Sequence, residues 1–226
     1  MRRKTTAVRI GNVVLSSEEP VLVQSMLNTS TREVDACVEQ AIRIIEAGGR
    51  LVRITAPGVK EAEMLGEIHR RLRERGYTTP ISADIHFVAE AASVAARYVE
   101  KVRINPGNFA DKRATFKKLT YTDEEYAAEL EILRQKFTEF LEVCRQYGTA
   151  VRIGTNHGSL SDRIMSRYGD TPAGMVEATM EYLRVCQACD FKDVVISLKS
   201  SDCRTMVDAV RLLVEKMEAE GMCYPL

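Results

Sequence analysis

Residues 102–108 read Val-Arg-Ile-Asn-Pro-Gly-Asn, and the tripeptide Val-Arg-Ile returns at residues 52–54 and 151–153. This apolar, polar, apolar order is typical of a β-strand, in which successive side chains point to opposite faces. Each copy is followed by a longer segment whose apolar residues recur at helical spacing. Repeated strand and helix units of this kind predict a parallel sheet joined by right-handed crossovers.

About six such units follow one another from residue 20 onward. We expect strands at residues 21–26, 51–54, 81–86, 101–105, 150–153 and 194–199, and helices that begin near residues 34, 59, 89, 122, 172 and 206. We expect a seventh strand to begin at residues 223–226. At 226 residues the chain is slightly short for a complete barrel, which typically has about 250.

Two closures of such a sheet compete, the open doubly wound sheet and the (β/α)8 barrel. Both faces of the open sheet are covered by helices, so its strands are almost continuously apolar. The polar residue inside each Val-Arg-Ile instead favours an incomplete (β/α)8 TIM-type barrel. Residues 8–15 resemble a β-hairpin that turns at Gly11-Asn12, placed to plug the bottom of the barrel.

The connection from residue 105 to residue 150 is about twice as long as the earlier ones. Within it, Thr122 and Glu125 have the spacing of a capping box at the start of one apolar stripe. We therefore predict a long helical insertion over about residues 107–148. No linker rich in Pro, Gly or Ser is present, so residues 1–226 are expected to form a single domain.

Lysine and arginine number 32, and aspartate and glutamate also number 32, so the formal net charge is zero. A non-specific nucleic-acid binder is therefore not expected, because such binding needs a basic surface. The hydrophobic share of 45% and the charged share of 28% exclude disordered and low-complexity classes. No apolar stretch approaches the roughly 20 residues that span a bilayer, and no signal peptide is apparent. We expect a cytoplasmic protein with reduced cysteines.

Strand parity selects the side chains that point into the barrel. If Val and Ile of each tripeptide pack against helices, Arg53, Arg103 and Arg152 point inward. The same parity turns inward a second set of polar residues: Thr55, Ser82, Asp84, His86, Asn105, Asn156, Ser197 and Lys199. Four cations thus converge on the carboxyl-terminal mouth, where barrel active sites lie. Because Asp84 alone cannot balance them, we predict a bound phosphate or diphosphate.

Each of these residues also has an ordinary structural explanation. A single arginine at a strand end can reach solvent or pair with Asp84, and a fourth copy of the tripeptide, around Arg9, lies on the expected hairpin. His86 can be a hydrogen-bonded structural histidine as readily as a ligand, and His157 can simply order its loop. The convergence of several cations is what favours a site.

Two further patterns are assigned to helices rather than to chemistry. Cys186 and Cys189 have the spacing of a redox or metal pair, but they fall in an expected helix and no second pair follows. The basic run at residues 70–75 closes another helix, where cations suit the helix dipole. The sequence predicts no metal site and no nucleotide-binding loop.

Five motifs, in order along the chain, carry a resemblance to a known family. They are Gln24-Ser25-Met26 with Asn28-Thr29, Ala83-Asp84-Ile85-His86-Phe87, the stretch 102–108, Val151-Arg152-Ile153-Gly154 with Asn156-His157-Gly158-Ser159-Leu160, and Ile196-Ser197-Leu198-Lys199 with Ser201-Asp202. Over roughly residues 5–226 the sequence resembles the 4-hydroxy-3-methylbut-2-enyl diphosphate synthases, iron–sulfur oxidoreductases of the non-mevalonate isoprenoid pathway.

This resemblance implies a barrel that binds 2-C-methyl-D-erythritol 2,4-cyclodiphosphate, in an enzyme that opens it reductively to (E)-4-hydroxy-3-methylbut-2-enyl diphosphate. It implies electron donation by flavodoxin or ferredoxin through a [4Fe–4S] cluster, and a homodimeric parent enzyme. The positions that match the family's substrate-binding residues are Arg53, Arg103, Asn105, Arg152, Asn156 and Lys199, to which we add Asp84 and His86.

Two parts of the family pattern are expected to lie beyond Leu226. One is a seventh-strand motif whose glutamate is thought to donate a proton, and the other is the domain that holds the cluster. The resemblance therefore predicts a truncated substrate-binding barrel that binds no cluster and is inactive alone, with its catalytic residues unassigned. A pterin-binding barrel similar to dihydropteroate synthase, and a non-catalytic barrel that binds anions or associates through its unpaired edge, remain alternatives.

Overall fold

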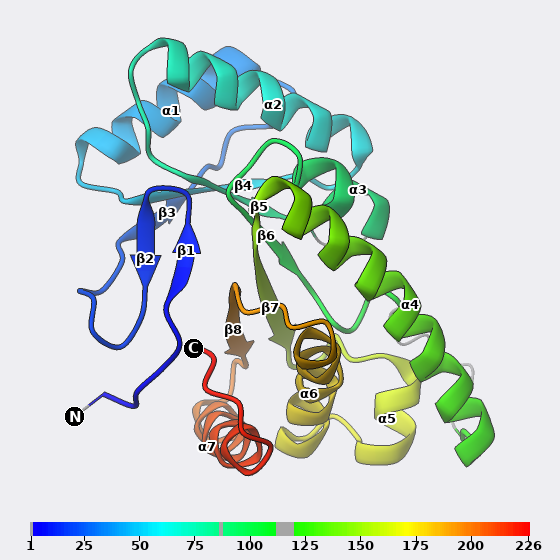
Figure 1. Cartoon of the computed structure of the whole chain (residues 1–226). Coiled ribbons are helices and arrows are strands. Elements are labelled where there is room, and N and C mark those ends of the chain that lie inside the picture. The colour runs from blue at the N-terminus through cyan, green and yellow to red at the C-terminus, as the bar shows by residue number, and fades with distance from the viewer. Residues whose placement is uncertain (1, 86–87, 112–119) are drawn as a thin grey trace.

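Six parallel strands form one curled sheet in the computed structural model, which describes residues 2–85, 88–111 and 120–226. Strands that are adjacent in the sheet are also consecutive along the chain, and Figure 1 shows them curving into an open half-barrel. They are β3 (Gln24–Met26), β4 (Leu51–Thr55), β5 (Ile81–Asp84), β6 (Lys101–Ile104), β7 (Ala150–Asn156) and β8 (Val194–Lys199). This topology confirms the predicted incomplete barrel.

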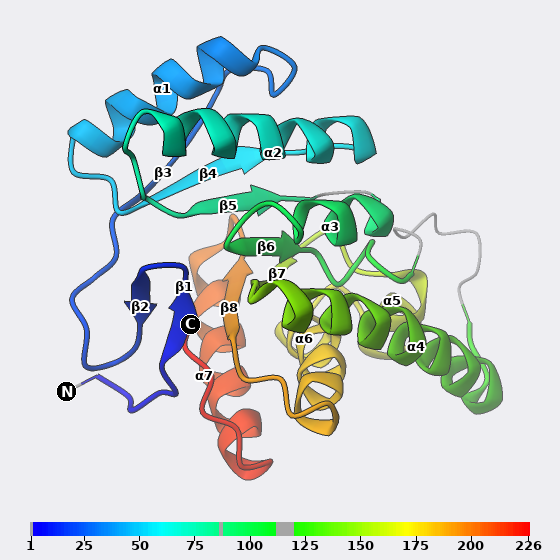
Figure 2. The ribbon, with the colours of Figure 1, turned by 45° about the horizontal axis from the view of Figure 1, so that its top comes forward.

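The helices pack on the outer side of the sheet (Figure 2). They are α1 (Val34–Glu46), α2 (Val59–Glu74), α3 (Ala89–Ala95), α4 (Asp123–Tyr147), α5 (Asp162–Tyr168), α6 (Pro172–Ala188) and α7 (Cys203–Ala219). Val52, Ile54, Val102 and Ile104 belong to the core shared with these helices and are fully buried. The arginine between each of these pairs therefore points to the inner side. None of the described helices has the length and apolar character needed to span a membrane.

The amino-terminal residues form the predicted hairpin. β1 (Val8–Ile10) pairs antiparallel with β2 (Val13–Leu15), and Gly11 turns the chain with φ +57°, in the left-handed region that glycine favours. The buried side chains of the hairpin pack against residues near the beginning of β4, β7 and β8, in a cluster of Val8, Ile10, Val13, Leu51, Ala150 and Val195. The hairpin thus covers the amino-terminal end of the half-barrel.

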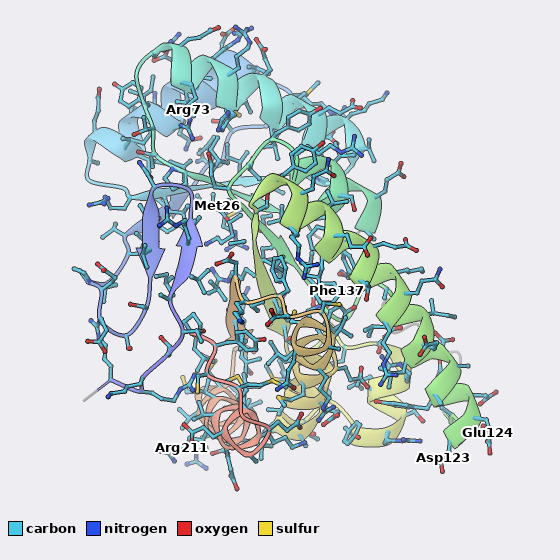
Figure 3. The ribbon with its side chains drawn as sticks, viewed as in Figure 1. Met26, Arg73, Asp123, Glu124, Phe137 and Arg211 are labelled. Carbon is cyan, nitrogen blue, oxygen red and sulfur yellow. The ribbon has the colours of Figure 1, made fainter. Side chains whose placement is uncertain are left out.

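The long connection between β6 and β7 contains the predicted helix, α4. Thr122 Oγ1 accepts a hydrogen bond from the Glu125 N–H, and the Glu125 carboxylate accepts one from the Thr122 N–H, which confirms the capping box. Phe137 lies on the buried side of α4, labelled in Figure 3, with its ring centroid 4.8 Å from that of Tyr182 in α6. Residues 112–119 of the predicted insertion lie outside the described residues.

Several boundaries differ from those predicted. β3 begins at Gln24 rather than at residue 21, because it is an edge strand and the preceding Val21 and Val23 are 76% and 57% exposed. The short helix α5 is absent from the sequence prediction, and α3 ends before residue 99. Residues 223–226 are not assigned to a strand, although Pro225 O accepts a hydrogen bond of 2.9 Å from the backbone N–H of Ile196 in β8.

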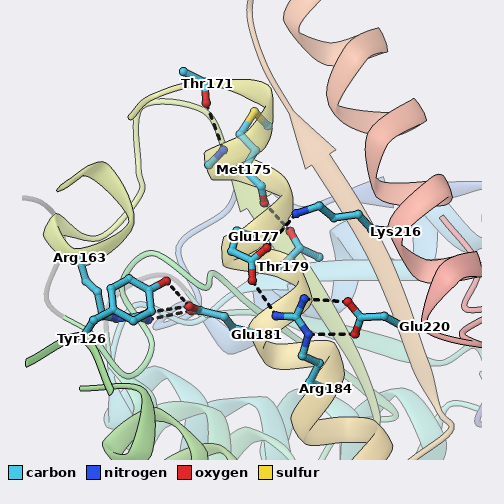
Figure 4. A network of polar contacts seen from close by, with 11 residues as sticks. Tyr126, Arg163, Thr171, Met175, Glu177, Thr179, Glu181, Arg184, Lys216 and Glu220 are labelled. Atoms are coloured by element: carbon cyan, nitrogen blue, oxygen red, sulfur yellow. Dashed lines mark hydrogen bonds and ion pairs between the residues drawn. The ribbon is translucent and has the colours of Figure 1, made fainter. Parts of the chain in front are cut away.

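A buried polar network joins α4, α5 and α6 (Figure 4). Arg163 in α5 is 2% exposed and donates to both carboxylate oxygens of Glu181 in α6, at 2.6 and 2.8 Å. Asp111 is a second partner of Arg163 at 2.9 Å, and the Tyr126 hydroxyl of α4 donates to Glu181. Burial alone would lower the pKa of Arg163, but hydrogen bonding to Glu181 and the charge of Asp111 raise it. The insertion is therefore anchored by a fixed buried cation.

Candidate functional site

Two of the predicted arginines share one buried carboxylate inside the half-barrel. Arg53 in β4 and Arg103 in β6 flank Asp84 in β5, because β5 lies between those two strands. Arg53 Nη2 lies 2.6 Å from Asp84 Oδ2, and Arg103 Nη1 lies 3.3 Å from Asp84 Oδ1. The Asp84 side chain is only 1% exposed. Two guanidinium groups and one carboxylate leave a net positive charge in this part of the interior.

Arg103 is also held by β7. Its Nη2 donates to the carbonyl oxygen of Gly154 at 2.8 Å. A Cβ atom at residue 154 would lie 2.5 Å from Arg103 Nε, so the glycine makes room for the guanidinium group. Burial lowers the pKa of Arg103, and the charge of Asp84 acts against that lowering. The position of this arginine is therefore set by three adjacent strands.

Arg152 in β7 is compensated less well, because the charge of Asp84 is the smallest of the influences on its pKa. Its Nε donates to the hydroxyl of Ser197 in β8 at 2.9 Å, and no ion pair of Arg152 occurs among residues 2–85, 88–111 and 120–226. Burial, followed by repulsion from Arg53 and Arg103, lowers the pKa of Arg152 to about 10. An anion that entered the half-barrel would relieve this repulsion.

Lys101 is a fourth interior cation, which the sequence prediction did not identify. It begins β6 two residues before Arg103, and the same parity that selects Arg103 would have selected it. Its side chain is buried, with 2% of the residue exposed, and its Nζ donates to Gln24 Oε1 at 3.4 Å. Burial, followed by repulsion from Arg152 and Arg53, lowers the pKa of Lys101 to about 7.

Asn105 connects two loops at the carboxyl ends of the strands. Its Nδ2 donates to Ser159 Oγ at 3.1 Å, and its Oδ1 accepts from the Gly107 N–H at 3.2 Å. The loops touch so closely that a Cβ at residue 107 would lie 1.6 Å from the carbonyl oxygen of Ser159. Since Asn105 is 3% exposed, its amide orders the mouth of the half-barrel in this structure.

The remaining predicted residues either lie further from the interior arginines and Asp84 or fall outside the described residues. Asn156 and Lys199 end β7 and β8 and are paired in register, with Asn156 half-buried and Lys199 exposed. His86 lies outside the described residues. His157 Nε2 lies 3.4 Å from Asp170 Oδ1, a contact that orders its loop. The structure thus brings together the arginines and Asp84, and places Lys199 at the rim.

Metal-ligating side chains do not gather in the described part of the chain, where no group of three or more His, Cys, Asp or Glu residues could hold a metal ion. Cys186 is buried in α6, and burial raises the pKa of its thiol well above the ordinary value. Cys189 follows the end of the same helix. These residues do not fit the [4Fe–4S] cluster that the resemblance implies, and we derive no step through one.

A parallel half-barrel closed at one end by a hairpin, with several cations in its interior, defines this chain as a barrel domain of the (β/α) class. The chain belongs to the GcpE TIM-barrel domain family, whose model matches residues 5–226.

Sequence relatives cover the whole chain. It is 60% identical over 225 residues to 4-hydroxy-3-methylbut-2-en-1-yl diphosphate synthase (flavodoxin) of Parabacteroides distasonis, covering 100% of this chain and 37% of that protein. It is 48% identical over 226 residues to the chloroplastic 4-hydroxy-3-methylbut-2-en-1-yl diphosphate synthase (ferredoxin) of Arabidopsis thaliana. The match covers 100% of this chain and 30% of that protein. The chain therefore spans about a third of the length of these curated relatives.

Solved structures support the fold alone. A truncated 3-deoxy-D-arabino-heptulosonate 7-phosphate synthase from Thermotoga maritima matches with a TM-score of 0.55 and 13% identity, covering 94% of this chain and 66% of that one. A 3-keto-D-glucoside 4-epimerase from E. coli matches with a TM-score of 0.53 and 12% identity, covering 91% of this chain and 90% of that one.

Proposed function

We propose that this chain is the substrate-binding barrel of a 4-hydroxy-3-methylbut-2-enyl diphosphate synthase and that it binds 2-C-methyl-D-erythritol 2,4-cyclodiphosphate. The observation that carries the proposal is the excess of cations inside the half-barrel. Arg53, Arg103 and Arg152 bring three positive charges, and Asp84 brings one negative charge, which leaves two positive charges before the partly neutral Lys101 is counted. A cyclic diphosphate carries two negative charges, because each of its phosphoryl groups has one ester and one anhydride linkage and keeps a single ionised oxygen. The names of the close relatives support this choice of anion.

The interior residues have different roles in this proposal. Arg152, which has no ion-pair partner among the described residues, makes the main contact with the diphosphate. Arg53 and Arg103 are oriented by Asp84, so that their remaining N–H groups are fixed before the anion arrives. Prepositioned donors of this kind can account for several kcal/mol of a reaction barrier.

The rim completes the proposed site. Asn156 and Lys199 are proposed to contact the substrate from the carboxyl ends of β7 and β8, as their match to the family motifs implies. His86, which lies outside the described residues, is proposed as a further contact. Asn105 is proposed to hydrogen-bond to the substrate and to hold together the two loops that its amide connects.

For the whole enzyme we propose reductive ring opening of the cyclodiphosphate. Two C–O bonds break, one to a ring phosphate oxygen and one to a hydroxyl group, which takes up a proton and leaves as water. Two electrons arrive one at a time from flavodoxin or ferredoxin, and a C=C bond forms between the two carbons. The iron–sulfur cluster would be held by residues other than the described ones of this chain. We further propose that this enzyme is homodimeric and cytoplasmic.

The proposal is tested by titrating the protein with the cyclodiphosphate in a calorimeter. Arg152→Met should weaken binding by about tenfold or more, since the loss of one charge-assisted hydrogen-bonding group costs roughly 1.5–3 kcal/mol. Arg152 is repelled by its neighbours, so its replacement should leave the thermal unfolding temperature unchanged or higher. Arg9→Met is the matched control, because Arg9 occupies the same tripeptide on the exposed surface of the hairpin.

Two results would contradict the proposal. Unchanged cyclodiphosphate affinity in Arg152→Met would remove this arginine from the site. Binding of a pterin diphosphate without binding of the cyclodiphosphate would favour a barrel similar to dihydropteroate synthase.

A further inference from the structure

A cavity of about 330 Å³ opens into the half-barrel between its two edge strands. Its apolar walls come from the hairpin side, from the strands and from α7, and include Leu15, Leu51, Val195 and Met206. Its polar lining consists of Gln24, Lys101, Arg152 and Ser197. Two cations therefore face one cavity whose described lining contains no carboxylate side chain.

The ammonium group of Lys101 has few hydrogen-bonding and no ion-pairing partners among the described residues. The residue is 2% exposed, and its one hydrogen bond, to Gln24 Oε1, is long at 3.4 Å. None of the ion pairs found within residues 2–85, 88–111 and 120–226 includes Lys101. An ammonium group buried in this way, with no ion-pair partner among the described side chains, is strongly disfavoured.

The neighbouring charges act in the same direction. The described charged groups that act on Lys101 are Arg152 in β7 and Arg53 in β4, both cationic. Asp84 in β5 is engaged by Arg53 and Arg103. The other polar groups that line the cavity beside Lys101, the Gln24 amide and the Ser197 hydroxyl, are uncharged. Burial and this repulsion bring the pKa of Lys101 to about 7, so the amine is partly neutral at physiological pH.

We propose that Lys101 is a further diphosphate-binding residue and that its amine takes up a proton as the anion enters the half-barrel. This inference rests on the proposed function, because the cyclodiphosphate supplies the charge that stabilises the ammonium form. The proton comes from solvent, and no bond of the ligand changes in this step. Binding thereby converts an unfavourable buried cation into one that is paired with the phosphate oxygens.

The test compares proton uptake on binding in the wild-type protein and in three variants. Calorimetric titration with the cyclodiphosphate at about pH 8, in buffers of different ionisation enthalpy, gives the number of protons bound, expected to be close to one in the wild type. Above about pH 7 the wild-type affinity should fall by about tenfold per pH unit, since one proton is linked to binding. The ligand does not contribute, because the single ionised oxygen of each of its phosphoryl groups does not titrate in this range.

The variants distinguish the effect of a positive charge at residue 101 from the effect of its protonation. Lys101→Arg keeps a permanent cation, so it should bind with little proton uptake and a flat pH profile. Lys101→Met should bind about tenfold or more weakly at about pH 6.5, again with a flat profile. Lys60→Met, which removes an exposed lysine of α2, should behave as the wild type. Thermal unfolding of each variant verifies that it is folded.

Failure of this inference is distinguishable from failure of the proposed function. Equal proton uptake in the wild type and in Lys101→Met, or equal affinity at about pH 6.5, would refute the role of Lys101 alone. Absence of cyclodiphosphate binding by the wild-type protein at every pH would refute the proposed function and this inference with it.

Discussion

The buried lysine should reduce the stability of the protein at neutral pH, and Lys101→Met should restore it. The variant replaces the ammonium group with an apolar side chain of similar length in the same cavity. The fall of the pKa from 10.5 to about 7, at 1.36 kcal/mol per unit, corresponds to a free-energy cost of about 5 kcal/mol for the charged form. Loss of the hydrogen bond to Gln24 offsets about 1 kcal/mol, which leaves a gain of about 4 kcal/mol at about pH 6.5.

The predicted stability difference also depends on pH, and it should decrease as the pH rises. Between about pH 7 and 10.5 the unfolded chain binds a proton that the folded Lys101 does not, so the wild-type unfolding free energy rises with pH. The cost is complete below about pH 7 and is largely gone by about pH 9.5. The stability difference between Lys101→Met and the wild type should therefore shrink to less than about 1 kcal/mol at that pH. The comparison ends there because Arg152, whose pKa is about 10, titrates next.

Urea unfolding followed by circular dichroism at several pH values measures this difference. Lys60→Met is the control, and its stability should stay within about 0.5 kcal/mol of the wild type because Lys60 is exposed. A Lys101→Met protein that is less stable than the wild type at about pH 6.5, or an offset that does not change with pH, would refute the reasoning.

Two structural predictions concern the loops and the insertion. Gly107→Ala places a Cβ 1.6 Å from the Ser159 carbonyl oxygen, so it should reduce the unfolding free energy by about 1–3 kcal/mol and weaken anion binding; a fully stable variant would show that the loops are not locked together. Arg163→Met leaves Glu181 and Asp111 buried without their cation, and should cost about 3–5 kcal/mol in urea unfolding at neutral pH. An Arg163→Met protein as stable as the wild type would contradict the assignment.

The inward arginines were predictable because strand geometry alone fixes them. Side chains of a strand alternate between two faces, so burial of Val and Ile against helices places Arg53, Arg103 and Arg152 inside. The hairpin and α4 were predictable for a similar reason, since a turn glycine and a capping box act within a few residues. The helix α5 was not, because it is seven residues long and is held by the distant partners of Arg163.

The ionisation and the contacts of individual side chains were harder to predict from the sequence. Parity could have identified Lys101, but its lowered pKa depends on cations from two other strands, and no local pattern reports them. Likewise, the contact between Asn105 and Ser159 joins residues 54 positions apart, through loops whose approach depends on Gly107. Sequence spacing therefore predicted that Arg53, Arg103 and Arg152 share the interior with Asp84, whereas the ionisation and contacts of each side chain depend on the packing of the whole barrel.

Stability and binding should respond in opposite directions to changes in the interior cations. Arg152 and Lys101 are buried beside like charges, so each is expected to reduce folding stability while it increases the affinity for a dianion. Gly107 and Arg163 instead hold the mouth and the insertion in place, so their replacement should reduce stability and binding together. A variant that binds more weakly but unfolds at higher temperature is thus evidence of a binding role. The zero net charge of the chain conceals this arrangement, because acidic residues elsewhere balance an interior that remains cationic until an anion enters.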